Sequence, residues 1–374
     1  MLDYDAVGAL PPRGSVVLHT EASSGFGGQE IRILEESRWL TTHGWPAVIA
    51  CQPASPLFEE ARRAGLPVLG IRMRHAADAL ALARLISVIR RTRAAIVHTH
   101  SSVDSWLATL AARLLGRTVV RSRHVSIPVR RWRALVYRLA DRVITSAEAV
   151  RAMLVAAGVP ADRVSVVPAG IDTTRFHPGV DGGRVRGELG LTGPVVGLVA
   201  NLRGSKGHAV FLEAARAVLE TAPDARFLIV GDGVGAARIR RLISEHGLDG
   251  AVLMTGFRRD IPEVMAALDV LVLPSTRTEA IPQVVAQALA VGTPVVATRF
   301  GGIPEIVRDG ETGTLVAPGD ARALARAIAG ALADPARARA KARAGQAMVQ
   351  RELTLEQAMS RTLAVYAEAL AARG

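Results

Sequence analysis

The stretch that decides the fold of this chain is Pro274-Ser275-Thr276-Arg277-Thr278-Glu279-Ala280-Ile281-Pro282-Gln283, together with the sequence on either side of it. The apolar run at 270–273 is typical of a buried parallel strand. Pro282 suits the first position of a helix, where its missing N–H has no partner, and Gly292 can end that helix in a left-handed conformation. Another apolar run follows at 295–298. Glu279 is therefore predicted in a loop between the carboxyl end of a strand and a helix N-terminus, where open α/β sheets bind ligands and anions.

The bulk composition indicates a folded protein of two domains. The chain has 374 residues, of which 49% are hydrophobic and 21% charged, so it can bury two cores. The single cysteine, Cys51, excludes a disulfide framework and a cysteine metal cluster. The net charge of +12 comes almost entirely from arginine, because Lys206 and Lys341 are the only lysines. We find no nucleic-acid-binding module, no signal peptide and no apolar segment of the roughly 18–20 residues that span a bilayer. A cytoplasmic protein is expected.

Apolar runs alternate with helical patterns in two separate sets, which predicts parallel sheets with helices on both faces. A Gly-rich stretch at 179–183 is the best candidate for a linker between the sets. The first set has predicted strands at 15–19, 46–50, 67–71, 94–98, 119–122 and 142–145. The second set has predicted strands at 195–199, 226–230, 252–257, 270–273 and 295–298.

The segment from Pro274 to Gln287 resembles the signature of family-four retaining glycosyltransferases of the GT-B architecture. In that signature Pro-Ser precedes a loop Glu, and a second Glu follows after seven residues; here the first is Glu279 and the second position holds Gln287. The resemblance implies an α/β fold of two Rossmann-like domains that face each other across a cleft. Residues 1–180 would form the acceptor-side domain and 190–352 the nucleotide-sugar domain, and a helix at 353–374 would cross back to the first domain.

The loop after the strand at 195–199 reads Ala200-Asn201-Leu202-Arg203-Gly204-Ser205-Lys206-Gly207-His208. In the family, an Arg and a Lys from this loop neutralise the departing nucleoside diphosphate. Lys206 matches that Lys, Asn201 occupies the usual Arg position, and Arg203 is predicted to take the Arg's role. Cations already in place stabilise the charge that grows as the glycosyl–phosphate bond breaks, so no metal or other cofactor is expected. The alternative is that Lys206 is a solvated loop residue.

By the same resemblance, Glu279 approaches the transferred sugar and Gln287 accepts a hydrogen bond from the nucleotide ribose. Gln283 lies four residues before Gln287 and shares its helix face. The backbone N–H groups at Ala280 and Ile281 are predicted to bind the β-phosphate and sugar hydroxyls. The Gln at position 287 loses the stronger charge-assisted bond, so a weakened or inactive homologue is the alternative.

In the first half, Gly27 and Gly28 let backbone approach a ligand closely, and in the family this loop helps to hold the donor phosphate or the acceptor. His124 matches a family His near the reacting sugar. His100 either lines the acceptor site or is an ordinary solvated or capped histidine. We expect no metal at these histidines, because no third ligand is spaced to complete a site.

A basic segment with an aromatic residue favours an anionic membrane surface or a phosphorylated lipid acceptor, and a solvated helix face is the alternative. Its central residues are Arg130, Arg131, Trp132 and Arg133. The protein is thus expected to be cytoplasmic, with peripheral attachment to the inner face of the membrane.

Together these features predict a retaining glycosyltransferase that moves a sugar from a nucleotide sugar, a UDP-sugar, to a saccharide or lipid-linked saccharide in surface-polysaccharide or lipopolysaccharide assembly. Two alternatives stay open: a nucleotide-sugar epimerase of the same fold, and a nucleotide-sugar-binding homologue without catalysis.

Overall fold

The structure is a computed structural model that describes residues 10–373, except for the side chains of Arg131 and Trp132. These residues form two compact units. The first contains the chain up to Gly170 together with the segment from Glu356 onward, and the second contains Ile171–Leu355.

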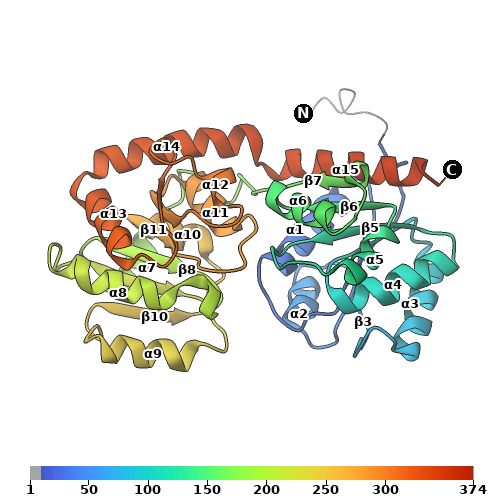
Figure 1. The fold of residues 1–374 in the computed structure, drawn as a ribbon, viewed down its shortest axis with the longest axis horizontal. Helices are drawn as coiled ribbons and strands as arrows, with labels where there is room; N and C mark the ends of the chain where they lie inside the picture. Colours follow the sequence, from blue (N-terminus) through green and yellow to red (C-terminus); the bar gives the residue numbers. More distant parts are fainter. Residues whose placement is uncertain (1–9, 374) are drawn as a thin grey trace. The chain divides into compact units, whose positions relative to one another are not determined.

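The first unit is built on a parallel sheet of seven strands in the order β3-β2-β1-β4-β5-β6-β7 (Figure 1). Its strands are β1 (Val17–Glu21), β2 (Ala47–Cys51), β3 (Val68–Gly70), β4 (Ile96–Thr99), β5 (Thr118–Arg123), β6 (Arg142–Thr145) and β7 (Val164–Val166). Its α-helices are α1 (Gly28–Thr42), α2 (Pro56–Arg63), α3 (Ala79–Thr92), α4 (Ser102–Leu114), α5 (Leu135–Arg138), α6 (Glu148–Ala156) and α15 (Leu355–Ala371).

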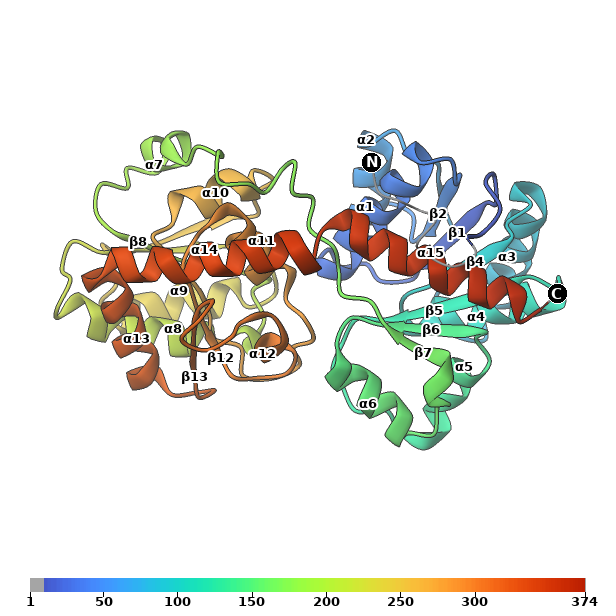
Figure 2. The same cartoon turned by 90° about the horizontal axis from the view of Figure 1, so that it is seen from above.

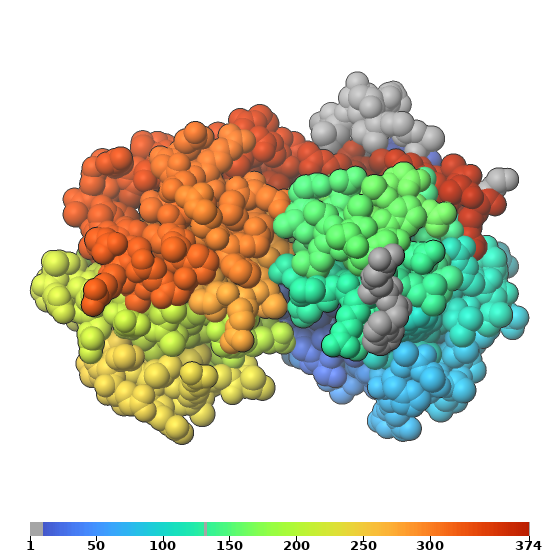
Figure 3. Space-filling view, viewed as in Figure 1, coloured from blue at the N-terminus to red at the C-terminus, as the bar shows by residue number. Residues whose placement is uncertain are grey.

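The second unit has a parallel sheet of six strands in the order β10-β9-β8-β11-β12-β13. Its strands are β8 (Val195–Val199), β9 (Arg226–Val230), β10 (Val252–Gly256), β11 (Val270–Leu273), β12 (Val295–Thr298) and β13 (Thr314–Val316). Its α-helices are α7 (Gly183–Glu188), α8 (His208–Leu219), α9 (Ala236–Glu245), α10 (Ile261–Ala267), α11 (Gln283–Val291), α12 (Ile303–Ile306), α13 (Ala321–Ala333) and α14 (Pro335–Glu352). Helices α13 and α14 lie at the surface of this unit (Figures 1 and 3).

Each sheet reverses its strand order once, between β1 and β4 in the first unit and between β8 and β11 in the second. All residues of β8 and β11 are buried, because helices cover both faces of the sheet. Ligands of such sheets bind at the carboxyl ends of the strands beside the reversal. The fold therefore singles out the loops after β1, β4, β8 and β11.

The boundary between the units falls after Gly170, ahead of the predicted linker at 179–183. Ile171 pairs with the returning chain, since its N–H bonds the Leu353 carbonyl at 2.8 Å and its carbonyl accepts the Leu355 N–H at 2.9 Å. Gly182 packs so tightly on the second unit that a Cβ there would lie 2.3 Å from the Ala267 nitrogen. The predicted linker is thus part of the second unit.

The C-terminal helix α15 packs on the first sheet (Figure 2). The hydroxyl of Tyr366, a fully buried residue, lies 2.7 Å from Nδ1 of His98 on β4. Glu368 pairs with Arg142 at the start of β6. Side chains far apart in the sequence thereby fix the helix to the unit that contains the N-terminal strands.

Strand predictions hold closely in the second unit and shift in the first. Val195–Val199, Arg226–Val230 and Val270–Leu273 are strands as predicted. The first strand runs to Glu21, two residues beyond its predicted end, and the short β13 was not predicted. Helix α11 begins at Gln283, so Pro282 is its N-cap and not its first helical residue. Gly292 ends α11 in the left-handed conformation, as predicted.

Candidate functional site

The loops after β8 and β11 meet beside the strand reversal of the second unit. The Thr276 N–H bonds the Ser205 carbonyl at 2.9 Å, which ties one loop to the other. Gly207 has a φ of +74°, and a Cβ there would lie 1.9 Å from the Pro274 carbonyl oxygen. Only glycine fits this close approach, so Gly207 is what allows the Lys206 loop to lie against the Glu279 loop.

Lys206 and Glu279 form an ion pair across this junction. Nζ of Lys206 lies 2.7 Å from Oε2 of Glu279, and the Ser275 hydroxyl donates to the same oxygen at 2.7 Å. The Glu279 side chain is 7% exposed and the Lys206 side chain is 23% exposed. The carboxylate is therefore nearly buried, whereas the ammonium still reaches solvent.

The backbone around Glu279 is held in an unusual shape. Thr278 has a φ of +53°, which is uncommon for a residue other than glycine and costs free energy. Behind it, a Cβ on Gly301 would lie 2.0 Å from the Glu279 carbonyl oxygen. Such a conformation persists where surrounding contacts impose it, and here the loop after β12 is one of those contacts.

The loop after β8, which contains Lys206, is held by backbone hydrogen bonds and leaves Arg203 exposed. The Leu202 N–H bonds the Asp232 carbonyl at 3.0 Å, and the Leu202 carbonyl accepts the Gly235 N–H at 2.9 Å. Asn201 is half-buried, and Arg203 is exposed on the same loop. Arg203 and Lys206 thus lie on one short segment at the sheet's carboxyl edge, where the Lys206 N–H donates to the Arg203 carbonyl at 3.1 Å.

Gln283 and Gln287 lie on α11, directly after the Glu279 loop. Ala280 is buried and Ile281 half-buried in the approach to the helix. Gln287 is only 9% exposed, and its side chain makes no hydrogen bond with another described residue. The structure therefore brings Lys206, Glu279, Ala280, Ile281, Gln283 and Gln287 to one edge of the second sheet.

In the first unit, the glycine loop follows β1 and precedes α1. The Gly27 N–H donates to the Glu30 carboxylate at 2.8 Å, and Gly28 is the first residue of α1. Glu21 accepts from the Ser23 N–H at 2.7 Å and from the Gln29 amide. Burial first, and the nearby carboxylate of Asp104 second, raise the pKa of Glu21 to about 8. The glycine loop thus rests on a carboxyl group that holds a proton well above its usual range.

His100 and His124 lie at the carboxyl ends of β4 and β5, with Nδ1 of His100 and Nε2 of His124 3.1 Å apart. Nε2 of His100 lies 2.9 Å from Nδ1 of His19, which the sequence analysis did not single out. His19 is the register partner of His98 in the β1–β4 pair. That pairing is the only signal that could have found it, and it depends on knowing which strands are neighbours.

Nitrogens of His19, His98 and His100 lie within 4.8 Å of one another, so the reason given for expecting no metal, that no third ligand is spaced to complete a site, is wrong. However, His98 already bonds Tyr366 and Ser122, at 2.7 and 2.8 Å. The rings of His98 and His100 lie 4.2 Å apart with 35° between their planes. His100 is likewise engaged at both nitrogens, by His19 and His124, so the described contacts already use these rings as members of a hydrogen-bond network.

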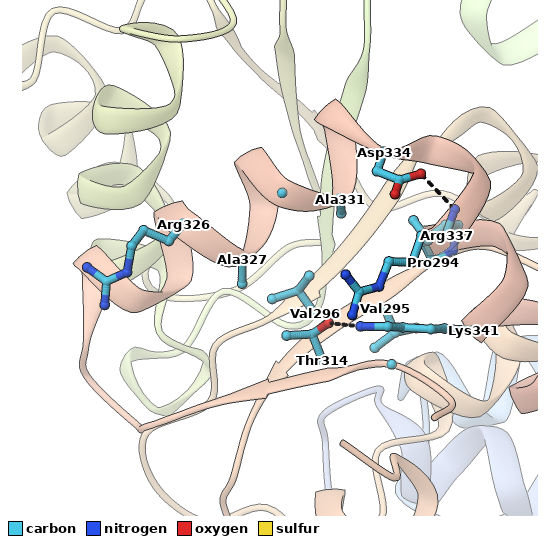
Figure 4. Close-up of a pocket in the computed structure, with 13 residues that line it drawn as sticks. Pro294, Val295, Val296, Thr314, Arg326, Ala327, Ala331, Asp334, Arg337 and Lys341 are labelled. Atoms are coloured by element: carbon cyan, nitrogen blue, oxygen red, sulfur yellow. Dashed lines mark hydrogen bonds between the residues drawn. The ribbon is translucent and has the colours of Figure 1, made fainter. Parts of the chain in front are cut away.

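A cavity of about 250 Å³ lies at the opposite, amino-terminal edge of the second sheet (Figure 4). It is lined by Val295 and Thr314 at the starts of β12 and β13 and by residues of α13 and α14. Arg337 and Lys341 extend into it, and Nζ of Lys341 lies 3.2 Å from the Thr314 hydroxyl. None of the predicted site residues lines this cavity.

The basic segment at 130–133 is part of an exposed surface. Arg130 and Arg133 are exposed, while the predicted Arg131 and Trp132 lie outside the described side chains. We use the name α4–α5 surface for these arginines and the exposed residues near them, Arg138, Leu110, Leu114, Leu135 and Leu139. Among the helices of residues 10–373, none has the length and apolar character needed to cross a bilayer.

Comparisons with known proteins agree with these features. Family models described as Glycosyltransferase Family 4 and Glycosyl transferases group 1 match residues 26–175 and 193–334. A 2-deoxystreptamine glucosyltransferase of Streptomyces kanamyceticus is 31% identical, over 91% of this chain and 99% of its own. The UDP-Gal:alpha-D-GlcNAc-diphosphoundecaprenol alpha-1,3-galactosyltransferase of Escherichia coli is 27% identical, over 83% and 86%. The crystal structure of Anabaena Alr3699/HepE in complex with UDP-glucose has a TM-score of 0.85 and 22% identity, over 93% and 98%.

Proposed function

Because the chain belongs to glycosyltransferase family 4 and has the GT-B fold of two Rossmann-like units, we propose that it is a retaining transferase that uses a UDP-sugar. The acceptor is proposed to be a saccharide or lipid-linked saccharide of surface-polysaccharide or lipopolysaccharide synthesis. Two named similarities support this choice: one relative is named for UDP-galactose and a diphosphoundecaprenol-linked acceptor, and one similar structure contains UDP-glucose.

The observation that carries the proposal is the Lys206–Glu279 pair at the strand reversal. The anion-binding elements gather there: an ammonium that is 23% exposed, an exposed Arg203 and the start of α11. The first amides of a helix have no acceptor within the helix and point toward an anion. A diphosphate at this edge would meet all three, and Glu279 would lie beside the sugar attached to it.

In the proposed reaction, the bond between the anomeric carbon and the diphosphate oxygen breaks, and its electron pair goes to the diphosphate. The acceptor oxygen bonds the anomeric carbon on the same face and passes its proton to the departing diphosphate, so the configuration is retained. Lys206, Arg203 and the amides near Ala280 stabilise the growing negative charge without reorganising. These groups come from the chain itself, and the proposal assigns no step to a cofactor.

The test begins with titration calorimetry of the purified protein with UDP-glucose, UDP-galactose, UDP-N-acetylglucosamine and GDP-mannose, followed by incubation of each bound donor with acceptors. Acceptors should include a diphosphoundecaprenol-linked sugar and 2-deoxystreptamine, because relatives are named for both. The anomeric configuration of the product is read by NMR. Donor binding followed by formation of an α-linked product from an α-linked donor supports the proposal. A product of inverted configuration, release of an epimerised sugar, or binding without turnover would each contradict it.

Attachment to an anionic membrane is a separate part of the proposal, and the α4–α5 surface supports it. Leu114 is 63% exposed on α4 and Leu135 47% exposed on α5, and Arg130 and Arg133 lie exposed beside α5. Each arginine near an anionic bilayer contributes about 1 kcal/mol. A lipid-linked acceptor would be presented at such a surface.

Vesicle sedimentation tests this attachment with phosphatidylglycerol and phosphatidylcholine vesicles. Replacing Arg130 and Arg133 by Gln should weaken binding to the anionic vesicles by about tenfold or more. The matched control replaces the exposed Arg339 and Arg343 of α14 by Gln, which removes the same charge elsewhere. Equal losses in both variants would mean that overall charge, and not the α4–α5 surface, governs binding.

A further inference from the structure

Three histidine rings form a chain that leads from the carboxyl edge of the first sheet into its core. His124, which is half-buried, contacts His100 at 3.1 Å, and His100 contacts His19 at 2.9 Å. His100 is 3% exposed and His19 is fully buried. Both contacts join ring nitrogens, so each ring bonds the next through the atoms that define its tautomer.

A neutral histidine has one N–H and one lone pair, and each contact in the chain needs one of each. The proton position on any one ring therefore fixes the proton positions on the other two. Burial keeps all three rings neutral: it lowers the pKa of His19 to about 4 and lowers the pKa values of His100 and His124 well below 6.5. Two arrangements remain, with every proton on Nδ1 or every proton on Nε2.

The buried end of the chain distinguishes the two arrangements. Nε2 of His19 is buried and has no hydrogen-bond partner among the described residues. With every proton on Nε2, His19 would hold an N–H donor in the core with nothing to accept it. With every proton on Nδ1, the same atom is an unpaired lone pair, and buried orphan donors are rarer than under-satisfied acceptors. The Nδ1 arrangement is therefore favoured, although Nε2–H is the commoner form of histidine in water.

His98 does not belong to this chain. Its two nitrogens bond the hydroxyls of Tyr366 and Ser122, and its ring packs against His100 in a tilted arrangement, with 4.2 Å between the ring centroids. Because its own nitrogens are bonded, the His98 ring is fixed, and its packing restricts the movement of the His100 ring. The Asp104 carboxylate bonds the His100 backbone N–H at 3.0 Å and does not engage the ring.

We propose that His19 and His100 are positioning residues that hold His124 as a neutral donor with its proton on Nδ1. This rests on the proposed function in one respect: His124 would direct that N–H to an oxygen of the sugar or acceptor. The tautomer itself is a property of the free protein, so the two parts can fail separately.

The first experiment is a long-range ¹H–¹⁵N correlation spectrum of the full chain with ¹⁵N-labelled histidine, at pH 7 and without substrate. Single His→Gln variants assign the rings. We expect Nδ1 to be protonated in His19, His100 and His124. A proton on Nε2 of any of these rings would overturn the proposal, whatever the activity of the protein.

The second experiment compares two variants of one shape, His19→Asn and His19→Asp. The Asn amide can donate to Nε2 of His100 as Nδ1–H of His19 does, whereas an ionised Asp carboxylate only accepts and so reverses the direction of the histidine chain. We expect His19→Asp to move the His124 proton to Nε2 and to have a kcat about tenfold below that of His19→Asn, with the same donor affinity. Equal tautomers in both folded variants would contradict the chain.

If the tautomers reverse as expected but kcat is the same in both variants, the hydrogen-bonded chain of histidines exists and His124 has no role in transfer. That result would count against the proposed use of His124 and not against the network. If His19→Asp does not fold, the spectrum of the unmodified protein still decides the tautomers.

Discussion

Replacing Lys206 by Ala tests the candidate site most directly. The change removes the ammonium that lies 2.7 Å from Oε2 of Glu279 and leaves the Ser275 hydroxyl as the remaining donor to that oxygen. Breaking a fully buried pair costs about 3–5 kcal/mol. Because Lys206 is 23% exposed, solvent can partly replace it, and we expect the free energy of unfolding to fall by about 1–3 kcal/mol.

The expected effect on catalysis is larger than the effect on stability. Removing one preorganised group that stabilises transition-state charge lowers turnover by about 10²–10³, or roughly 3–4 kcal/mol. Lys206→Arg should recover part of it, since the charge is kept but a planar guanidinium does not reproduce the compact ammonium. Adding Glu279→Gln to Lys206→Ala should restore stability, because no unpaired carboxylate remains, while turnover stays low.

The chain provides a matched control for this experiment. Lys341 is the other lysine, and it lies at the amino-terminal edge of the same sheet. Lys341→Ala should leave kcat and donor affinity close to those of the unmodified protein. Thermal unfolding monitors stability, and initial rates with a saturating donor monitor turnover. A folded Lys206→Ala protein whose turnover stays within a few-fold of the original would refute the role given to Lys206.

Three further predictions concern other parts of the molecule. Gln287→Ala should weaken donor binding by about 1 kcal/mol, the value of an ordinary hydrogen bond, and calorimetry measures it; unchanged affinity would remove the ribose assignment. Gly207→Ala should lower the melting temperature and donor affinity together, because its Cβ would meet the Pro274 carbonyl oxygen at 1.9 Å, and normal values of both would show that the loops can separate. The contribution of Glu21 to the free energy of unfolding should fall as pH rises from about 4.5 to about 8, because folded Glu21 keeps a proton that the unfolded chain releases. Glu21→Gln should remove this pH dependence in denaturant titrations. An unchanged pH dependence would show that Glu21 is not its source.

The second unit could be predicted from sequence because its signals are local. Long apolar runs gave β8, β9 and β11 with correct bounds, and Gly292 ended α11 as its conformational freedom suggests. Lys206 and Glu279 each follow such a strand, and carboxyl ends of parallel strands share one edge of a sheet. Their proximity follows from that rule, but the ion pair itself does not.

The first unit shows what local signals leave out. The predicted first strand ended at His19, whereas β1 continues to Glu21 and pairs His19 with His98. Which strands are neighbours depends on contacts between residues about 80 positions apart. Because β1 and β4 are buried along their whole length, no alternation of apolar and polar residues indicates their register. The histidine chain therefore could not be predicted, although its members are visible in the sequence.

The resting ion pair also bears on how the proposed site would accept its donor. Glu279 is nearly buried, so without a ligand it needs Lys206 nearby to offset the cost of its charge. A diphosphate would compete for the same ammonium, and its binding would have to compensate for any weakening of that pair. The hydroxyl groups of a bound sugar can supply this compensation, because they donate to carboxylate oxygens. A nucleoside diphosphate without its sugar lacks those donors. The site should therefore bind the intact nucleotide sugar more tightly than the nucleoside diphosphate, and Glu279→Gln should reduce that difference; equal affinities in the unmodified protein would show that Glu279 does not sense the sugar.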